Sequence, residues 1–236
     1  MANQEPCIRT ETKDFYPTPH SDFLKMVFND NANVCGFDFE VVGIGKASLK
    51  MTQYFMKAIE EVGISTHMEY VDLDNNYMIV KKAIIFGKNG LNCSCSLYAG
   101  SLVERFGEYV KKGRKLLFPV FEMRLKDGEG SEFPINREQL EALGILLSRN
   151  EEEESISEYD ELRELTLEVA EIVKRILAKK GITLLDIELE FGAIENEDDT
   201  FEYILIGDIS PKSIRCSKKG KILGPVELAA LFLNEK

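Results

Sequence analysis

The 236-residue chain lacks several features that mark other classes of protein. No apolar run approaches the roughly 20 residues that a membrane-spanning helix needs, and residues Met1 to Pro6 contain no apolar signal core. Basic residues are few, since 29 Lys and Arg stand against 41 Asp and Glu and the net charge is −12. A broad nucleic-acid interface needs a cationic stripe. We therefore expect a cytoplasmic protein that binds neither membrane nor nucleic acid, although a local group of cations would still suit a small anion.

Cysteine and histidine are also scarce. Five scattered cysteines do not form a disulfide framework, and Cys93 and Cys95 are the only close pair. Two reduced thiols on one face of a strand explain this pair better than a metal or redox site. The reason is that no second Cys or His pair stands at ligand spacing. Neither of the two histidines, His20 and His67, is expected to be catalytic.

The chain is 44% hydrophobic and 30% charged, which is normal for a globular protein. The clearest helix is predicted from about Ser157 to Lys180, with Leu162, Val169 and Ile176 in its apolar stripe. Shorter helices are predicted at about 46–62, 100–113, 136–143 and 225–233, and strands at 23–28, 37–42, 68–71, 77–86 and 91–98. We expect an α+β fold of two lobes with antiparallel sheets and a cleft between the lobes.

Two further strands near the C-terminus carry acidic residues. Leu184 to Gly192 alternates acids with large apolar residues, and Tyr203 to Pro211 follows after an acidic loop. A hairpin with its turn near Asp199 would place Glu190 roughly opposite Asp208, with Cβ atoms about 5 Å apart. Two such carboxylates repel each other unless a cation lies between them, and Mg²⁺ suits oxygen ligands of this kind. An acidic solvent face on an edge hairpin explains the same pattern, so both interpretations stay open.

Other positions favour phosphate binding. Gly100 and Ser101 precede a short helix that contains Arg105, and amide groups at a helix N-terminus attract phosphate. Ser210 and Arg215 add a hydroxyl and a guanidinium that can bind phosphate through two hydrogen bonds. Lys126 is predicted in a loop rich in glycine and acid. Together these positions predict a cleft that holds a metal, a nucleotide and a phosphorylated substrate.

Six blocks, in order between Phe23 and Lys219, resemble one enzyme family. They are Gly63–His67, Val80–Lys82, Ala99–Gly107, Glu132–Asn136, Leu185–Gly192 and Gly207–Arg215. The third block is similar to Ala-Gly-Ser-x-x-x-Arg-x-Gly, and the fifth to Val-Asp-Phe-Lys-Leu-Glu-Phe-Gly. Such motifs are typical of the SAICAR synthetase family, also called phosphoribosylaminoimidazole-succinocarboxamide synthases. Its members join aspartate to a carboxylated aminoimidazole ribonucleotide.

The resemblance implies an ATP-dependent, amide-forming ligase with ATP and Mg²⁺ as cofactors, and it implies a role for each matching residue. Magnesium would be held by Glu190 and Asp208, which would also position the nucleotide, and the nucleotide phosphates would be contacted by Lys13 and Lys126. The substrate's ribose phosphate would be bound by Ser101, Arg105 and Arg215. The reacting carboxylate or the incoming amine would be faced by Asp186 and Glu132. Residues 1–96 would form a mostly antiparallel β lobe on the nucleotide side, and residues 97–236 an α+β lobe on the substrate and metal side. The substrates implied are a nucleotide-like carboxylate and an amino acid, and the family commonly self-associates.

The chain also departs from the family pattern. The nucleotide loop reads Thr10 to Lys13, without the family's glycine and first lysine. Glu188 stands where the family has a lysine, and an arginine of the family is absent near Cys95. These departures indicate a divergent member.

Three hypotheses therefore follow. The first is a divergent ligase that couples a different heteroaromatic carboxylate to an amino acid such as aspartate, in modified nucleoside or specialised metabolism. The second is a pseudoenzyme that acts as a nucleotide-binding or regulatory module, as the altered loop and Glu188 favour. The third is another phosphoryl-transfer reaction on the same scaffold.

Overall fold

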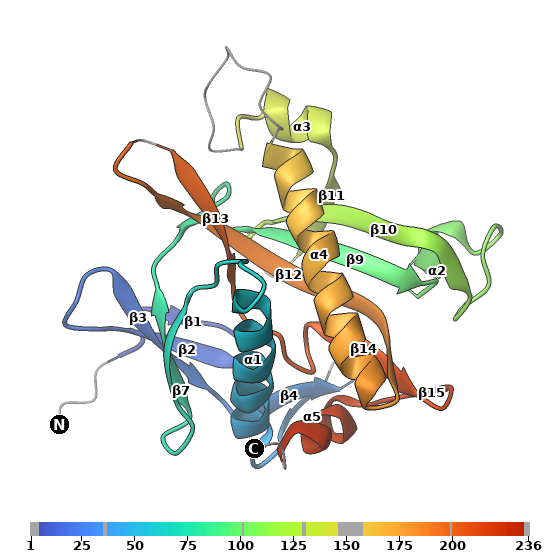
Figure 1. Ribbon diagram of the computed structural model, residues 1–236, viewed down its shortest axis with the longest axis horizontal. Coiled ribbons are helices and arrows are strands. Elements are labelled where there is room, and N and C mark those ends of the chain that lie inside the picture. Colours follow the sequence, from blue (N-terminus) through green and yellow to red (C-terminus); the bar gives the residue numbers. More distant parts are fainter. Residues whose placement is uncertain are drawn as a thin grey trace. The chain divides into compact units, whose positions relative to one another are not determined.

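A computed structural model describes residues 5–34, 37–100, 102–128, 131–145, 158–198 and 200–233. The chain forms two compact units (Figure 1). The first unit contains residues 1–82, 208–212 and 223–236, and the second contains residues 83–207 and 213–222. The mixed fold with antiparallel sheets confirms the predicted class.

The first unit is built on a five-stranded antiparallel sheet with the order β1-β2-β3-β7-β6. These strands span Ile8–Arg9, Lys13–Pro17, Phe23–Phe28, Tyr77–Lys81 and Met68–Asp72. A separate pair of strands is formed by β4 (Asn31–Val34) and β5 (Phe37–Glu40). Helix α1 (Ile44–Glu60) buries Leu49 and Met56 against Met26 and Met78 of the sheet. Helix α5 (Pro225–Leu233) packs on α1, where the Phe55 and Phe232 rings lie 5.5 Å apart.

A glycine allows α1 to begin close to β3. A Cβ atom at Gly45 would lie 2.8 Å from the carbonyl oxygens of Phe28 and Asn29, closer than real Cβ atoms come to backbone. The amides of Gly43 and Gly45 both donate to Asp30, at 3.0 Å each. The start of α1 is therefore held close to the end of β3 by the side-chain carboxylate of Asp30, which accepts from both amides.

The second unit contains an eight-stranded sheet with the order β11-β10-β9-β12-β14-β15, and β13 and β8 both pair with β12. These strands are β8 (Ile84–Ile85), β9 (Leu91–Tyr98), β10 (Lys115–Lys126), β11 (Glu132–Ile135), β12 (Ile182–Glu195), β13 (Phe201–Ile206), β14 (Ile214–Lys218) and β15 (Lys221–Ile222). Its helices are α2 (Leu102–Phe106), α3 (Arg137–Ala142) and α4 (Glu158–Lys179). Helix α3 begins with a capping box between Asn136 and Gln139.

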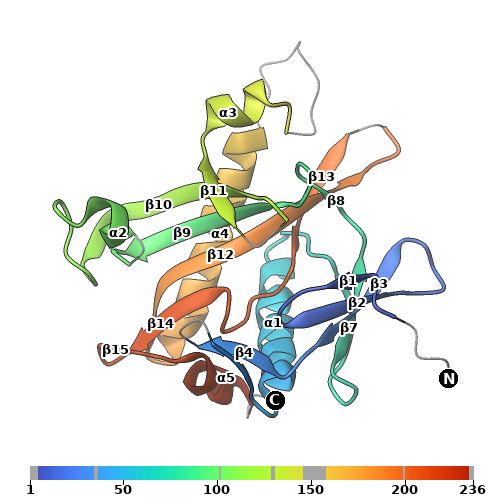
Figure 2. The same ribbon diagram turned by 180° about the vertical axis from the view of Figure 1, so that it is seen from behind.

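Helix α4 covers one face of this sheet, and Figure 2 shows the sheet from the other side. Buried residues of α4, including Leu162, Val169 and Leu177, supply the apolar stripe that packs on β9, β10 and β12. Cys93 and Cys95 are buried on β9, and burial raises their thiol pKa values to about 12 and about 11. Both are free cysteines, as the interpretation of reduced thiols in a strand predicted.

Several predicted boundaries differ from the structure. The division predicted between residues 96 and 97 falls inside β9, whose hydrogen bonds to β10 and β12 keep it within one sheet. The single strand predicted at 77–86 is two strands, β7 and β8, which belong to different sheets. The short helix and its exit predicted between Gly100 and Gly113 are α2 and the turn that leads back into β10. Within the described residues, no helix is long and apolar enough to cross a membrane.

Candidate functional site

The face of the large sheet opposite α4 is polar. Along β12, Ile187, Leu189 and Phe191 are buried, whereas Asp186 and Glu188 alternate with them on the open face. This follows from the period of two in a strand. The same alternation continues to Glu190, so the three predicted acids share one face.

The neighbouring strands add polar residues to this face in register. On β9, Asn92 lies opposite Glu190, and Ser94 opposite Glu188. On β10, Arg124 lies opposite Asn92, and Glu122 opposite Ser94. The face therefore has polar rows that run across β12, β9 and β10. We call this set of residues, with Glu132 of β11, the polar face.

Glu188, which departs from the family pattern, has a cationic partner. Arg124 Nη1 lies 3.1 Å from Glu188 Oε1 and 3.9 Å from Glu132 Oε2, and Arg124 Nη2 lies 3.9 Å from Glu122 Oε2. One guanidinium thus serves carboxylates from three strands. The negative charge that Glu188 brings to β12 is balanced from β10.

Lys126 and Glu190 form an ion pair that joins β10 to β12. The prediction of a loop at Lys126 was wrong, because Lys126 is the last residue of β10 and lies opposite Glu132 of β11. The lysine and the acid that sequence reasoning assigned to the nucleotide are therefore adjacent on the polar face.

Asp186 and Arg215 also form an ion pair, across the ladder between β12 and β14. Burial raises the pKa of Asp186, and Arg215 and Arg124 oppose that shift. Gly100 makes room for the arginine, because a Cβ there would lie 1.5 Å from Arg215 Nη2. The block around Ala99 and the block around Arg215 thus meet in space.

Two further residues, Arg105 and Ser101, were predicted to contact the substrate phosphate, and the structure describes only the first of them. Arg105, on α2, forms an ion pair with Glu122 and so reaches the edge of the polar face. Ser101 lies outside the described residues. In the described part of the chain, Arg215 Nε has no hydrogen-bond partner.

In the first unit, Lys13 and Asp208 form an ion pair whose side chains are 13% and 12% exposed. Burial opposes ionisation of Asp208, but Lys13, a hydrogen bond with Ser210 and the charge of Lys212 together hold its pKa below the usual value. Lys212 in turn pairs with Glu11. The loop from Thr10 to Lys13 is therefore tied to the block that follows Gly207.

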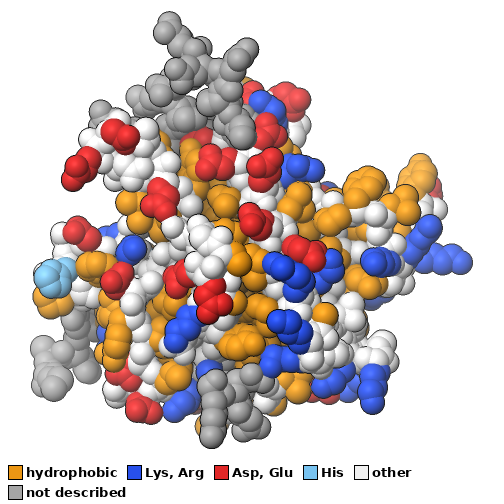
Figure 3. Space-filling view, viewed as in Figure 1, with side chains coloured by type: hydrophobic (Ala, Val, Ile, Leu, Met, Phe, Trp, Pro, Cys, Tyr) orange, Lys and Arg blue, Asp and Glu red, His pale blue; other side chains and the backbone are white. Residues whose placement is uncertain are grey.

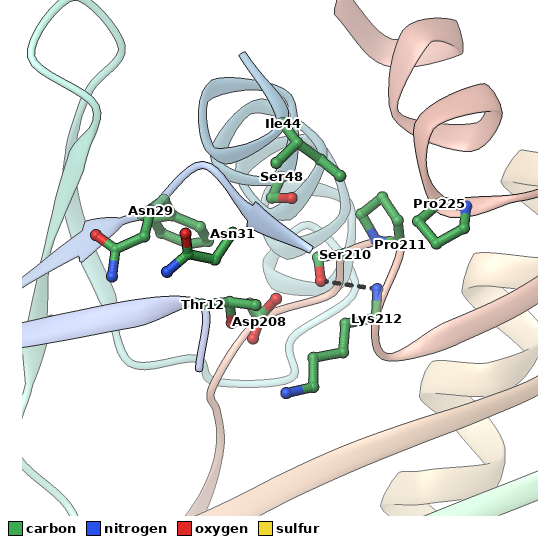
Figure 4. Close-up of a pocket in the computed structure, with 11 residues that line it drawn as sticks. Thr12, Asn29, Asn31, Ile44, Ser48, Asp208, Ser210, Pro211, Lys212 and Pro225 are labelled. Carbon is green, nitrogen blue, oxygen red and sulfur yellow. Dashed lines mark hydrogen bonds between the residues drawn. The ribbon is translucent and has the colours of Figure 1, made fainter. Parts of the chain in front are cut away.

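Asp208 lines a cavity of about 240 Å³ in this unit. Figure 4 shows Asp208, Ser210 and Thr12 around it, with Ser48 on α1. The Lys212 amide donates to Ser210 Oγ at 3.2 Å. The cavity combines hydroxyl, amide and carboxylate groups with an apolar wall formed by Phe28, Ile44, Pro211 and Pro225.

The predicted register of the acidic hairpin was wrong. Strands β12 and β13 do pair antiparallel, but Glu190 lies opposite Ile206, not Asp208. Strand β13 ends at Ile206, and Gly207 then adopts φ +80°, which turns the chain out of the ladder. Glu190 belongs to the second unit and Asp208 to the first.

The two proposed magnesium ligands offer suitable chemistry. Both are carboxylates, and each has a lysine as its partner here. Mg²⁺ is commonly held by one or two carboxylates, with waters and phosphates completing its shell. Among the described residues, no group of three or more His, Cys, Asp or Glu is arranged to hold a metal. Each carboxylate, taken by itself, is thus the kind of ligand that an ion with waters and phosphates in its shell would use.

Sequence reasoning missed Asn92, Glu122 and Arg124. A signal for two of them was present, because Glu122, Arg124 and Lys126 alternate with Phe121, Met123 and Leu125 along the chain. The same period of two predicts a strand with one polar face. Asn92 had no comparable signal, because its role depends on its neighbours in β10 and β11.

Comparison with known proteins identifies the family. The SAICAR synthetase model matches residues 8–226. The chain is 39% identical to the phosphoribosylaminoimidazole-succinocarboxamide synthase of Clostridium tetani (strain Massachusetts / E88), over 88% of this chain and 86% of that protein. It is 30% identical to the synthase of Acinetobacter baylyi (strain ATCC 33305 / BD413 / ADP1), over 91% and 83%.

Solved structures agree. A SAICAR synthetase in complex with ADP matches with a TM-score of 0.78 and 30% identity, over 92% of this chain and 87% of that one. The SAICAR synthetase of Pyrococcus horikoshii OT3 matches with a TM-score of 0.74 and 28% identity, over 95% and 91%. The chain belongs to the SAICAR synthetase family.

Proposed function

We propose that this protein is an ATP-dependent ligase that phosphorylates a heteroaromatic, nucleotide-type carboxylate and couples it to an amino acid such as aspartate. The observation that carries the proposal is the polar face, where Asp186, Glu188 and Glu190 each have a cationic partner. The charged groups of a substrate with carboxylate, phosphate and amine groups can replace one partner of each ion pair and bind to the other. The names of the relatives and the ADP complex of one of them support the same reaction class.

The chemistry has two steps. In the first, an oxygen of the substrate carboxylate attacks the γ-phosphorus of ATP, which forms an acyl phosphate and releases ADP. In the second, the amine nitrogen attacks the acyl carbon, the C–N bond forms, and phosphate leaves with its oxygen. The amine gives up a proton, for which Asp186 and Glu132 are the proposed neighbours.

The proposed binding roles rest mainly on the charged side chains of the candidate site. Lys13 and Lys126 would bind nucleotide phosphates, and Arg105, Arg215 and Ser101 would bind the ribose phosphate of the substrate. Arginine suits a phosphate because its planar fork donates two parallel hydrogen bonds. Glu190 and Asp208 would hold Mg²⁺, which when bound would neutralise charge on the transferred phosphoryl group.

One observation favours a substrate other than that of the relatives. Glu188 and Arg124 form a charge pair at a position where the family motif has a lysine. The motif's lysine is replaced by an acid, but Arg124 supplies a cation beside it, so the pair suits altered specificity better than loss of activity. The pseudoenzyme hypothesis depends on the shortened set of cations between Thr10 and Lys13.

The test follows ADP release from ATP and Mg²⁺ with carboxyaminoimidazole ribonucleotide and a panel of amino acids. We expect turnover, and we expect Glu190→Gln and Asp208→Asn each to reduce it at least about 100-fold, since each removes a charge at the phosphates. Glu195→Gln, at the exposed end of the same strand, is the matched control and should retain wild-type turnover.

The outcomes separate the hypotheses. No binding of ATP by calorimetry, with or without Mg²⁺, contradicts the ligase. Binding of ATP without turnover on any carboxylate supports the pseudoenzyme. Turnover with a different heteroaromatic carboxylate, but not with the aminoimidazole, supports altered specificity.

A further inference from the structure

Asn92 is a buried polar residue to which the family motifs assign no role. It lies on β9, opposite Glu190 on one side and Arg124 on the other, and is only 7% exposed. Burial of an amide is unfavourable unless its groups are hydrogen-bonded. The partners of Asn92 therefore decide why the residue is tolerated at the centre of the polar face.

The orientation of the Asn92 amide is determined by Glu132. Asn92 Nδ2 lies 3.1 Å from Glu132 Oε1 and 3.4 Å from Glu132 Oε2. An ionised carboxylate can only accept hydrogen bonds, so the amide nitrogen must face it. The opposite orientation would place two acceptors against each other. The nitrogen thus aims the Glu132 carboxylate, and the oxygen Oδ1 is turned away from it.

Asn92 Oδ1 has no hydrogen-bond donor within the described part of the chain. An unsatisfied buried acceptor is rare, and each case calls for an explanation. A ligand that donates an N–H group would satisfy this oxygen. Glu122 Oε2, another acceptor on the polar face, also has no hydrogen-bond partner among these residues. Asn92 Oδ1 and the carboxylate of Glu132, which the same side chain contacts, are both acceptors, so this position suits an amino group.

The ion pair between Lys126 and Glu190 crosses β9 beside this oxygen. Glu190 lies opposite Asn92, and the Lys126 stem passes within 4.0 Å of where a Cβ of Gly90 would be. Both partners are proposed contacts of the nucleotide and its metal. In the proposed function both would turn to those ligands, which would open the pair on the strand that carries Asn92.

We propose that Asn92 is a substrate-binding and positioning residue: its Nδ2 group aims Glu132, and its Oδ1 accepts a hydrogen bond from an amino group of a substrate. This proposal rests on the proposed function, because it assumes that Glu132 faces the reacting groups. The amino group belongs either to the heteroaromatic carboxylate or to the incoming amino acid. Both offer the same N–H donors, and the experiment distinguishes them.

The experiment compares Asn92→Leu with Asn196→Leu by steady-state kinetics. Leucine keeps the volume but removes both hydrogen bonds, so we expect kcat/KM to fall about 10- to 100-fold for the substrate that donates the N–H, with KM for ATP unchanged. A rise in KM for the heteroaromatic carboxylate or for the amino acid identifies that substrate. Asn196→Leu is the control, because it makes the same substitution at an exposed asparagine between β12 and β13, whose Nδ2 group donates to Thr200 Oγ1 at 2.9 Å.

A second variant separates positioning from packing. Asn92→Asp keeps an acceptor but places a second carboxylate beside Glu132, near Arg124 and Lys126. Like charges disfavour joint ionisation, so the acid limb of the kcat/KM profile should move to higher pH by about one unit. A purely structural role would not move this limb. If Asn92→Leu does not fold, Asn92→Asp still tests the proposal.

The outcomes distinguish a failure of the ligase proposal from a failure of the proposed role of Asn92. If the wild type turns over but both Asn92 variants match Asn196→Leu in KM and pH profile, Asn92 has no such role and the ligase stands. If the wild type does not turn over, calorimetry with carboxyaminoimidazole ribonucleotide decides. Weaker binding to Asn92→Leu then supports the subsite without the ligase, and equal or absent binding overturns it.

Discussion

At the scale of residues, Asp208 shows how partners outweigh burial. Burial alone would raise the pKa of this carboxyl, yet its pKa lies below the usual value because of Lys13, Ser210 and Lys212. The residue type was predictable from the block after Gly207. Its dependence on Lys13 was not, because the two residues lie far apart in the chain and meet only in the folded unit.

Lys13→Met is predicted to destabilise the protein at neutral pH and to make its stability less sensitive to acid. A lowered native pKa means that Asp208 contributes stability above its unfolded pKa, about 3.8, and that this contribution is lost as the pH falls further. Without Lys13, burial dominates and raises the pKa of Asp208 above its unfolded value, so the cost of the unpaired carboxylate is relieved as the pH falls toward that unfolded value. We expect about 3 kcal/mol less free energy of unfolding at pH 7, since an unpaired buried charge remains. Urea unfolding by circular dichroism between pH 3 and 7 measures this.

The control is Lys46→Met, an exposed lysine on α1. It removes the same charge from the same unit without leaving a buried partner. Identical acid dependence of the two variants would show that the pair between Lys13 and Asp208 does not stabilise the fold.

At the scale of elements, alternation along a strand was readable, but the order of strands was not. The period of two in β12 predicted that Asp186, Glu188 and Glu190 share a face, and the structure places them on the side opposite α4. The pairing of β12 with β9, and of β9 with β10, brings Arg124 to Glu188 across a third strand. From the sequence alone Glu188 was an anomaly, because nothing in the sequence showed that Arg124 is its partner.

A double-mutant cycle on Arg124→Met and Glu188→Gln is predicted to show coupling of about 1 kcal/mol in the free energy of unfolding. The pair is 3.1 Å apart, with the arginine side chain only 20% exposed. Partly buried geometry reduces screening, so the coupling should exceed that of an exposed helical pair. Lys174 and Glu171 on α4 are the control pair, for which about 0.3 kcal/mol is expected.

Equal coupling in the two cycles, measured by urea unfolding, would contradict a structural role for the Arg124 pair. Loss of ligase turnover in Glu188→Gln without loss of stability would instead assign Glu188 to the substrate.

At the scale of the whole molecule, charge decides which partners are excluded. The net charge of −12 disfavours long anionic polymers. Acidic and basic side chains both reach the face shown in Figure 3. Each cation of the candidate site has at least one acidic partner, an arrangement that suits a small ligand with several charged groups.

The protein is therefore predicted not to bind single- or double-stranded DNA at about 150 mM salt, where non-specific binders have dissociation constants of about 10⁻⁴ to 10⁻⁶ M. Fluorescence anisotropy with a labelled oligonucleotide checks this, with a basic DNA-binding protein as the positive control. A saturable signal that weakens with added salt would show that local cations overcome the net charge.

The sequence by itself determined the class of fold, the principal helix, the polar face of β12 and, through ordered motifs, the family. These properties are encoded locally, in the spacing of apolar residues and in short blocks. Only the tertiary structure decided that Glu190 lies opposite Ile206, that β9 belongs with the second unit, and that Arg124 balances Glu188. Strand order and register join residues far apart in the chain, so the partner of each charged group depends on how the sheet assembles.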